Sequence, residues 1–166
     1  MLSLLARPSG VLRRTRLLGR ATRLTRAEWR DFLRAQTALC GAQISVWVRP
    51  VGALVSDRPA SGASGPQPDA SPVAEAQTWS DARRLATAVR RAAEHGVFRP
   101  KCLVRSIALS RMLDRRRITG SRVCVGVQRD GERFTAHAWV ELHGRVLGDV
   151  TWHVRAFTPL TEVRVV

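Results

Sequence analysis

The spacing of the apolar residues changes part-way along the chain, and this change constrains the fold more than any other feature. Up to about residue 117 the apolar residues recur every three or four positions, which is typical of amphipathic helices. From Val123 onward they alternate with other residues, as in the run Val123, Val125 and Val127, and this is the period of a β-strand. Helices followed by strands predict an α+β fold in which helices pack on an antiparallel sheet.

The first helix is expected to begin at the sequence T-R-A-E of residues 25–28, because this is a capping box, and to end near Pro50. Its large apolar residues share one face. We expect this face to cover the domain's own core; docking onto a second protein or a membrane is the alternative. The face comprises Trp29, Leu33, Cys40, Ile44 and Trp47.

Two further helices are expected, over residues 78–96 and 102–117. Ser80 can cap the first of these, and Gly96 can end it in the left-handed conformation. Pro100 favours a new helix start just after it, which places Cys102 in the first helical turn.

The strands should form a hairpin with a turn at Asp130-Gly131 and a second strand over residues 134–142. A three-residue loop over residues 142–144 would lead to a third strand from Arg145 to about Trp152, followed by a short strand or loop. In that register residue 137 lies opposite residue 149. The sequence therefore predicts that His137 and Asp149 face each other.

A stretch rich in Pro, Gly and Ser over residues 56–72 has no apolar period and predicts a flexible linker. We expect three parts: a basic helical N-terminal extension over residues 1–55, the linker over residues 56–77, and the main domain over residues 78–166.

The chain has 166 residues and a net charge of +15, enough for one compact domain with extensions. Seven arginines and no acid lie within residues 1–26, so an anionic partner for this arm, nucleic acid or anionic lipid, is one reading. All basic residues except Lys101 are arginine, which also fits a GC-rich genome, and no nucleic-acid partner is expected. With no secretory signal and no membrane-spanning segment recognisable, a cytoplasmic location is expected.

The three cysteines, Cys40, Cys102 and Cys124, are an odd number without metal-ligand spacing, so neither a disulfide framework nor a metal site is expected. Cys40 and Cys124 are interpreted as packed residues of a helix and a strand. Cys102 differs from them, because the positive end of a helix dipole, with Lys101 and Arg105 nearby, favours its thiolate form.

A nucleophilic cysteine needs a base, and the base needs a group that fixes its tautomer. His137 and Asp149 fit these two roles. Trp139 lies on the same strand face as His137 and could shield the imidazole or bind substrate. Glu141 is too far along that strand to bond His137, and His143 and His153 are interpreted as surface residues.

Three segments carry a resemblance to a known family: RPKCLVRSIALSRML from residue 99, VCVGVQ from residue 123 and FTAHAWVELHGRVLGDV from residue 134. Together they resemble the protease domain of lasso-peptide biosynthesis B proteins, a branch of the transglutaminase-like, papain-related superfamily. The resemblance covers roughly residues 80–160 and includes the family's cysteine, histidine and aspartate as Cys102, His137 and Asp149.

The resemblance implies a papain-like fold and a leader peptidase that needs no cofactor. Such an enzyme removes the leader of a ribosomally made precursor so that a separate ATP-dependent cyclase can close the lasso ring. It further implies that a separate winged-helix-like protein recognises the leader, since residues 1–55 are too short for that domain. The alternatives are another acyl transfer on the same three residues, such as transglutamination, and a basic binding module.

Overall fold

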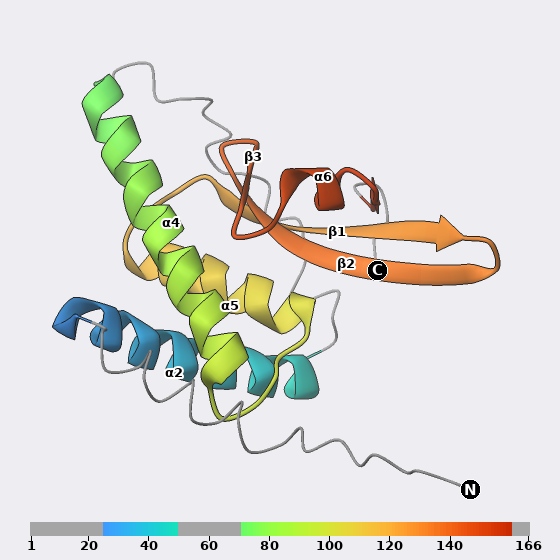
Figure 1. The fold of residues 1–166 in the computed structure, drawn as a ribbon, viewed down its shortest axis with the longest axis horizontal. Helices are drawn as coiled ribbons and strands as arrows, with labels where there is room; N and C mark the ends of the chain where they lie inside the picture. Colours follow the sequence, from blue (N-terminus) through green and yellow to red (C-terminus); the bar gives the residue numbers. More distant parts are fainter. Residues whose placement is uncertain (1–24, 50–70, 161–166) are drawn as a thin grey trace, which may run out of the picture.

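A computed structural model describes residues 25–49 and 71–160 (Figure 1). The expectations for the arginine-rich arm before residue 25 and for the linker up to residue 70 lie outside these residues. Three long helices come first and four strands with one short helix follow. In chain order these are α2 (Arg26–Val48), α4 (Pro72–His95), α5 (Cys102–Arg115), β1 (Ser121–Asp130), β2 (Arg133–Leu142), β3 (Arg145–Leu147), α6 (Thr151–Val154) and β4 (Thr158–Pro159).

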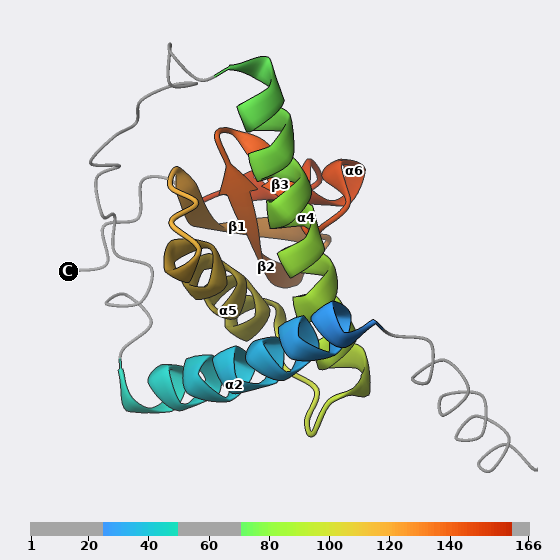
Figure 2. The same ribbon diagram turned by 90° about the vertical axis from the view of Figure 1, so that its left-hand side faces the viewer.

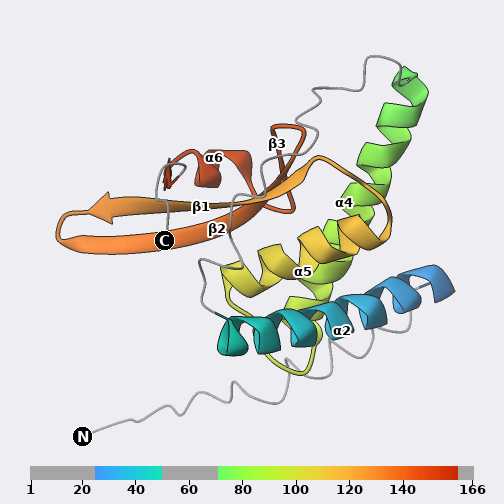
Figure 3. The same ribbon diagram turned by 180° about the vertical axis from the view of Figure 1, so that it is seen from behind.

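The strands form one antiparallel sheet in the order β3-β2-β1-β4. The sheet lies between α5 on one face and the short α6 on the other (Figure 3), while α2 and α4 pack against α5 to complete the helical layer (Figure 2). Val140, Leu142 and Leu147 join the helical core, whereas Trp139 packs with Val154 and Phe157 on the α6 side. The expected α+β architecture is confirmed.

The α2 helix contributes to the domain core, as expected, but with a different face from the predicted one. The predicted stripe is exposed: Trp29 retains 41% of its surface, Trp47 retains 76%, and Cys40 is also exposed. Alanines and one leucine face α4 and α5 instead, because small side chains let helix backbones approach closely. The buried residues of α2 are Asp31, Ala35, Ala38, Leu39 and Ala42.

The N-terminus of α2 is fixed by the predicted capping box. The Thr25 hydroxyl accepts a hydrogen bond from the Glu28 backbone N–H, and the Glu28 carboxylate accepts one from the Thr25 N–H at 2.9 Å. Glu28 also accepts a hydrogen bond from Arg91 of α4 at 2.8 Å. The bond from Arg91, followed by those from Thr25, lowers the pKa of Glu28 from 4.5 to about 2. One carboxylate thus caps α2 and ties it to α4.

The α4 helix begins six residues earlier than predicted, at Pro72, so residues 72–77 belong to a helix and not to the linker. Proline is well suited to the first helical position, because the amide hydrogen it lacks has no partner there. At the C-terminal end of α4, the expectation of a left-handed Gly96 was wrong, since Gly96 has φ −84°. A Cβ at Gly96 would instead collide with the side chain of Gln36, whose amide donates to the Ala92 carbonyl at 2.6 Å.

Within residues 25–49 and 71–160, no helix combines the length and the apolar character that crossing a bilayer requires.

Candidate active site

Cys102 is the first residue of α5, as the sequence predicted, and it is half-buried. Lys101 precedes it in an extended conformation and makes no side-chain cap, and the first turn of α5 holds no acidic residue. The backbone amides of this turn and the positive end of the helix dipole therefore face the thiol without a competing carboxylate.

His137 and Asp149 form a direct hydrogen bond, with 2.6 Å between His137 Nε2 and Asp149 Oδ2. The second carboxylate oxygen accepts the backbone N–H of Val150 at 2.7 Å. Burial raises the pKa of Asp149, but the hydrogen bonds from His137 and Val150 outweigh burial and leave its pKa below the usual 3.8. Asp149 is thus held as a carboxylate against the imidazole.

The backbone geometry that brings Asp149 next to His137 differs from the predicted strand pairing. The turn between β2 and β3 has two residues, His143 and Gly144, so Leu142 pairs with Arg145 and the expected register was wrong by one. The third strand also ends early, because Gly148 takes the left-handed φ of +79° and breaks the extended chain. Asp149 therefore follows a sharp turn and is not paired within a strand.

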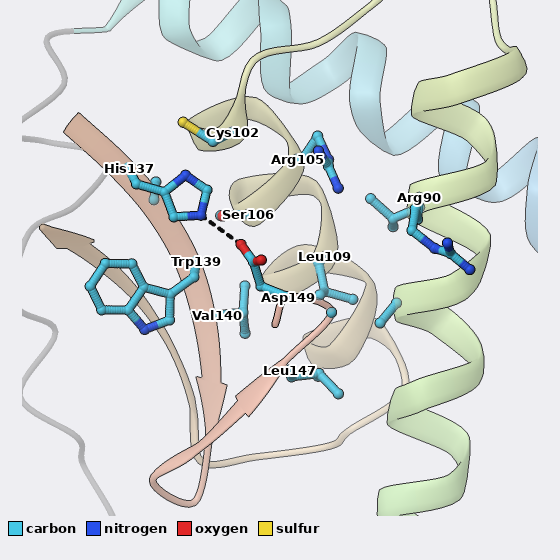
Figure 4. Close-up of a pocket in the computed structure, with 14 residues that line it drawn as sticks. Arg90, Cys102, Arg105, Ser106, Leu109, His137, Trp139, Val140, Leu147 and Asp149 are labelled. Atoms are coloured by element: carbon cyan, nitrogen blue, oxygen red, sulfur yellow. Dashed lines mark hydrogen bonds and ion pairs between the residues drawn. The ribbon is translucent and has the colours of Figure 1, made fainter. Parts of the chain in front are cut away.

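Cys102, His137 and Asp149 line one small pocket between α4, α5 and the edge of β2 (Figure 4). The imidazole has one nitrogen on Asp149, and its other nitrogen lies on the side of the ring where Cys102 is found. Because β3 is too short to reach residue 137, the edge of β2 is open at this point. Arg90 and Arg105 also line the pocket, and Asp149 is its acidic residue.

Trp139 is almost fully buried, at 3% exposure, and its indole N–H donates to Glu141 at 3.1 Å. Its ring lies nearly parallel to that of His137, with 6.2 Å between centroids. This placement suits a residue that shields the imidazole, while a broad contact with substrate would need more exposed surface. Glu141 also accepts a hydrogen bond from Arg122 at 2.6 Å, so it is anchored away from His137.

The other two cysteines differ from Cys102 in their surroundings. Cys124 packs beside Trp139, and burial raises the pKa of its thiol to about 11, in keeping with the predicted strand residue. Cys40 is exposed on α2, so its interpretation as a packed residue was wrong. Neither of them lines the pocket of Cys102.

His153 is a residue near the site that sequence reasoning missed. It was expected on a strand surface, but it lies on α6, and its ring centroid is 4.9 Å from that of His137. Its Nδ1 is 3.7 Å from Asp149 Oδ1. The signal was the spacing of four residues between Asp149 and His153, which brings side chains together on a helical turn but separates them on a strand.

Residues 38–162 match the family model described as the transglutaminase-like superfamily. The match covers most of the chain, and the protein therefore belongs to this superfamily, whose members are typically cysteine-dependent enzymes. Comparisons with curated proteins and with solved structures gave no match. The family and the fold together support a thiol-dependent activity of the peptidase or acyltransferase type.

Proposed function

We propose that the protein is a cysteine peptidase in which Cys102 is the nucleophile, His137 the general base and acid, and Asp149 the group that orients His137. The observation that carries this proposal is the shared pocket, which is lined both by a thiol at a helix start and by a histidine already bonded to a carboxylate. The bond to Asp149 keeps a proton on Nε2 and leaves Nδ1 free to accept the thiol proton.

In the proposed reaction the Cys102 sulfur attacks the scissile carbonyl carbon, and His137 gives its proton to the departing amine. A thioester remains on Cys102. Water then attacks the thioester with His137 as base, which releases the acid product and restores the thiol. In this proposal the backbone N–H of Cys102, at the start of α5, stabilises the negative charge that develops on the carbonyl oxygen.

For the substrate we propose the leader region of a lasso-peptide precursor. The support is the resemblance of three segments, around Cys102, around residues 123–128 and around His137 and Asp149, to the lasso-peptide B proteases. A separate winged-helix-like protein would present the leader, and an ATP-dependent cyclase would take the freed core peptide. The arginines lining the pocket suit a substrate with acidic side chains near the cleaved bond.

The test is mass spectrometry of the precursor peptide after incubation with this protein and the recognition protein. Wild type and Cys40→Ser should cut one bond, and Cys102→Ser should cut none. The Cys40 variant is the matched control, because Cys40 is exposed on α2 and outside the pocket.

Cleavage that survives in Cys102→Ser would reject the thiol mechanism. A product whose mass shows a new amide to an added amine, with Cys102 required, would identify an acyltransferase on the same three residues.

A further inference from the structure

Three side chains of types that bind metal ions lie close together beside the pocket: His137, Asp149 and His153. The proposed reaction uses the first two but not His153. The ligand atoms of the three residues, one from each, all lie within 4.8 Å of one another. The side chains are 17%, 24% and 43% exposed, so an ion from solvent can reach them. No metal site is predicted from the sequence, because the cysteines lack metal-ligand spacing.

Contacts with residues outside the cluster hold each of these three side chains in position. Asp149 is held by the Val150 N–H. The His153 ring meets Phe157 edge-on at 5.3 Å between centroids, and its backbone N–H donates to the Val150 carbonyl at 3.0 Å. His137 stands on β2 with Trp139 alongside. A preformed site of this kind loses little conformational entropy when an ion binds.

We propose that His137, Asp149 and His153 bind one zinc ion, and that this ion inhibits the enzyme. Two imidazoles and one carboxylate are ligands that zinc favours, whereas magnesium and calcium prefer sites made of oxygen. Ligand atoms of a tetrahedral zinc site lie about 3.4 Å apart, so shifts on the order of 1 Å convert the observed cluster into one. A water molecule would complete the four ligands.

Inhibition follows from which nitrogen of His137 carries the proton when zinc is bound. This part rests on the proposed function. Zinc would take the Nε2 lone pair of His137 and displace the hydrogen bond to Asp149. A neutral imidazole bound to zinc through Nε2 carries its one hydrogen on Nδ1. The nitrogen facing Cys102 then presents an N–H in place of a lone pair and cannot accept the thiol proton.

Binding is tested first, without substrate, by titrating the purified chain with zinc in a calorimeter and with cobalt in a spectrophotometer. Wild type should bind one zinc, and His153→Gln should raise the zinc dissociation constant at least about tenfold. His143→Gln is the matched control, because His143 is exposed on the β2–β3 turn. Magnesium should not compete.

Cobalt reports the ligand type, since thiolate ligands add a strong near-ultraviolet band that nitrogen and oxygen ligands lack. We expect no such band. Equal zinc affinity in wild type and His153→Gln, a thiolate band, or binding lost in Cys40→Ser would each overturn the site.

Inhibition is tested second, on precursor cleavage. Zinc should stop cleavage by wild type, and a chelator should restore it. Zinc bound through His153 without any effect on cleavage would overturn the inhibitory role, as would a chelator that abolishes cleavage. If wild type cleaves nothing under any condition, the proposed function fails, while the calorimetric result still decides the metal site.

Discussion

Asp149 depends on its neighbour Gly148 for its direction. The left-handed backbone at Gly148 turns the chain out of β3, and a Cβ there would lie 3.2 Å from the Ala86 Cβ and 3.4 Å from the Leu109 Cδ2. A side chain would therefore be strained by its φ and crowded by α4 and α5. The carboxylate of the site is placed by a backbone conformation in contact with the helical core.

The exchange Asp149→Asn tests the orienting role, because it replaces one carboxylate oxygen by an NH2 group. An amide at this position can donate its N–H to His137 Nε2, which leaves the imidazole proton on Nδ1 and removes the base. We expect kcat/KM for precursor cleavage to fall about 100- to 10,000-fold. The control is Asp114→Asn, an exposed carboxylate at the end of α5. An unchanged rate in Asp149→Asn, with an unchanged unfolding midpoint, would refute the role.

The candidate site shows which residues a sequence can and cannot place. The helix start identified Cys102, and the strand motif identified His137, because both signals are local. The pairing of His137 with Asp149 was expected for a wrong reason, since the register was off by one and Gly148 supplied the turn instead. His153 was missed because a four-residue helix carries too little apolar period to be seen.

Among the elements, α2 has two apolar faces, and the predicted one, with Leu33, Ile44 and Trp47, lies outward. Sequence patterns weigh tryptophan, leucine and isoleucine heavily and alanine lightly. The inner face is built from alanine and Leu39 because α2 must lie close to α4 and α5. The existence of the helix, its capped start and its attachment to the core were predicted correctly, but its orientation was not.

The link between α2 and α4 through Glu28 predicts a specific dependence on pH. The folded-state pKa of about 2 lies below the ordinary 4.5, so Glu28 stabilises the folded state fully above pH 4.5 and loses this effect as the pH falls toward 2. The exchange Glu28→Gln should lower the free energy of unfolding at neutral pH, and the difference from wild type should shrink between pH 4.5 and 2.

Urea unfolding at a series of pH values measures this difference. Glu132→Gln is the control, because Glu132 is exposed in the β1–β2 turn. A difference between wild type and Glu28→Gln that stays constant down to pH 2 would show that the carboxylate charge is not responsible.

For the whole molecule, the helical layer is one packing unit although α2 precedes residues 50–70 and the other two helices follow them. Residues of α2 belong to the same buried cluster as those of α4 and α5. A chain shortened to residues 78–166 lacks α2 and the first turns of α4, and it exposes the surface that Leu39 covers. We expect it to lose cooperative thermal unfolding, measured by circular dichroism, while residues 25–166 keep it. Cooperative unfolding of residues 78–166 would show that α2 is dispensable.

The amino-acid composition of this buried helical layer also determines which substitutions it tolerates. The helices α2 and α4 contribute mostly alanine to it, whereas α5 contributes larger residues such as Ile107, Leu109 and Leu113. Exchange of an alanine for glycine removes a single carbon and costs about 1 kcal/mol of helix propensity, whereas exchange for a larger residue forces two helices apart at a cost of about 1–3 kcal/mol. At the alanine positions of α2 and α4 harm therefore comes mainly from added volume. In α5, the helix that carries Cys102, harm comes from lost volume instead, because shortening Leu109 or Leu113 would leave a cavity. The buried alanines are Ala35, Ala38, Ala42, Ala82, Ala86, Ala88, Ala92, Ala93 and Ala108.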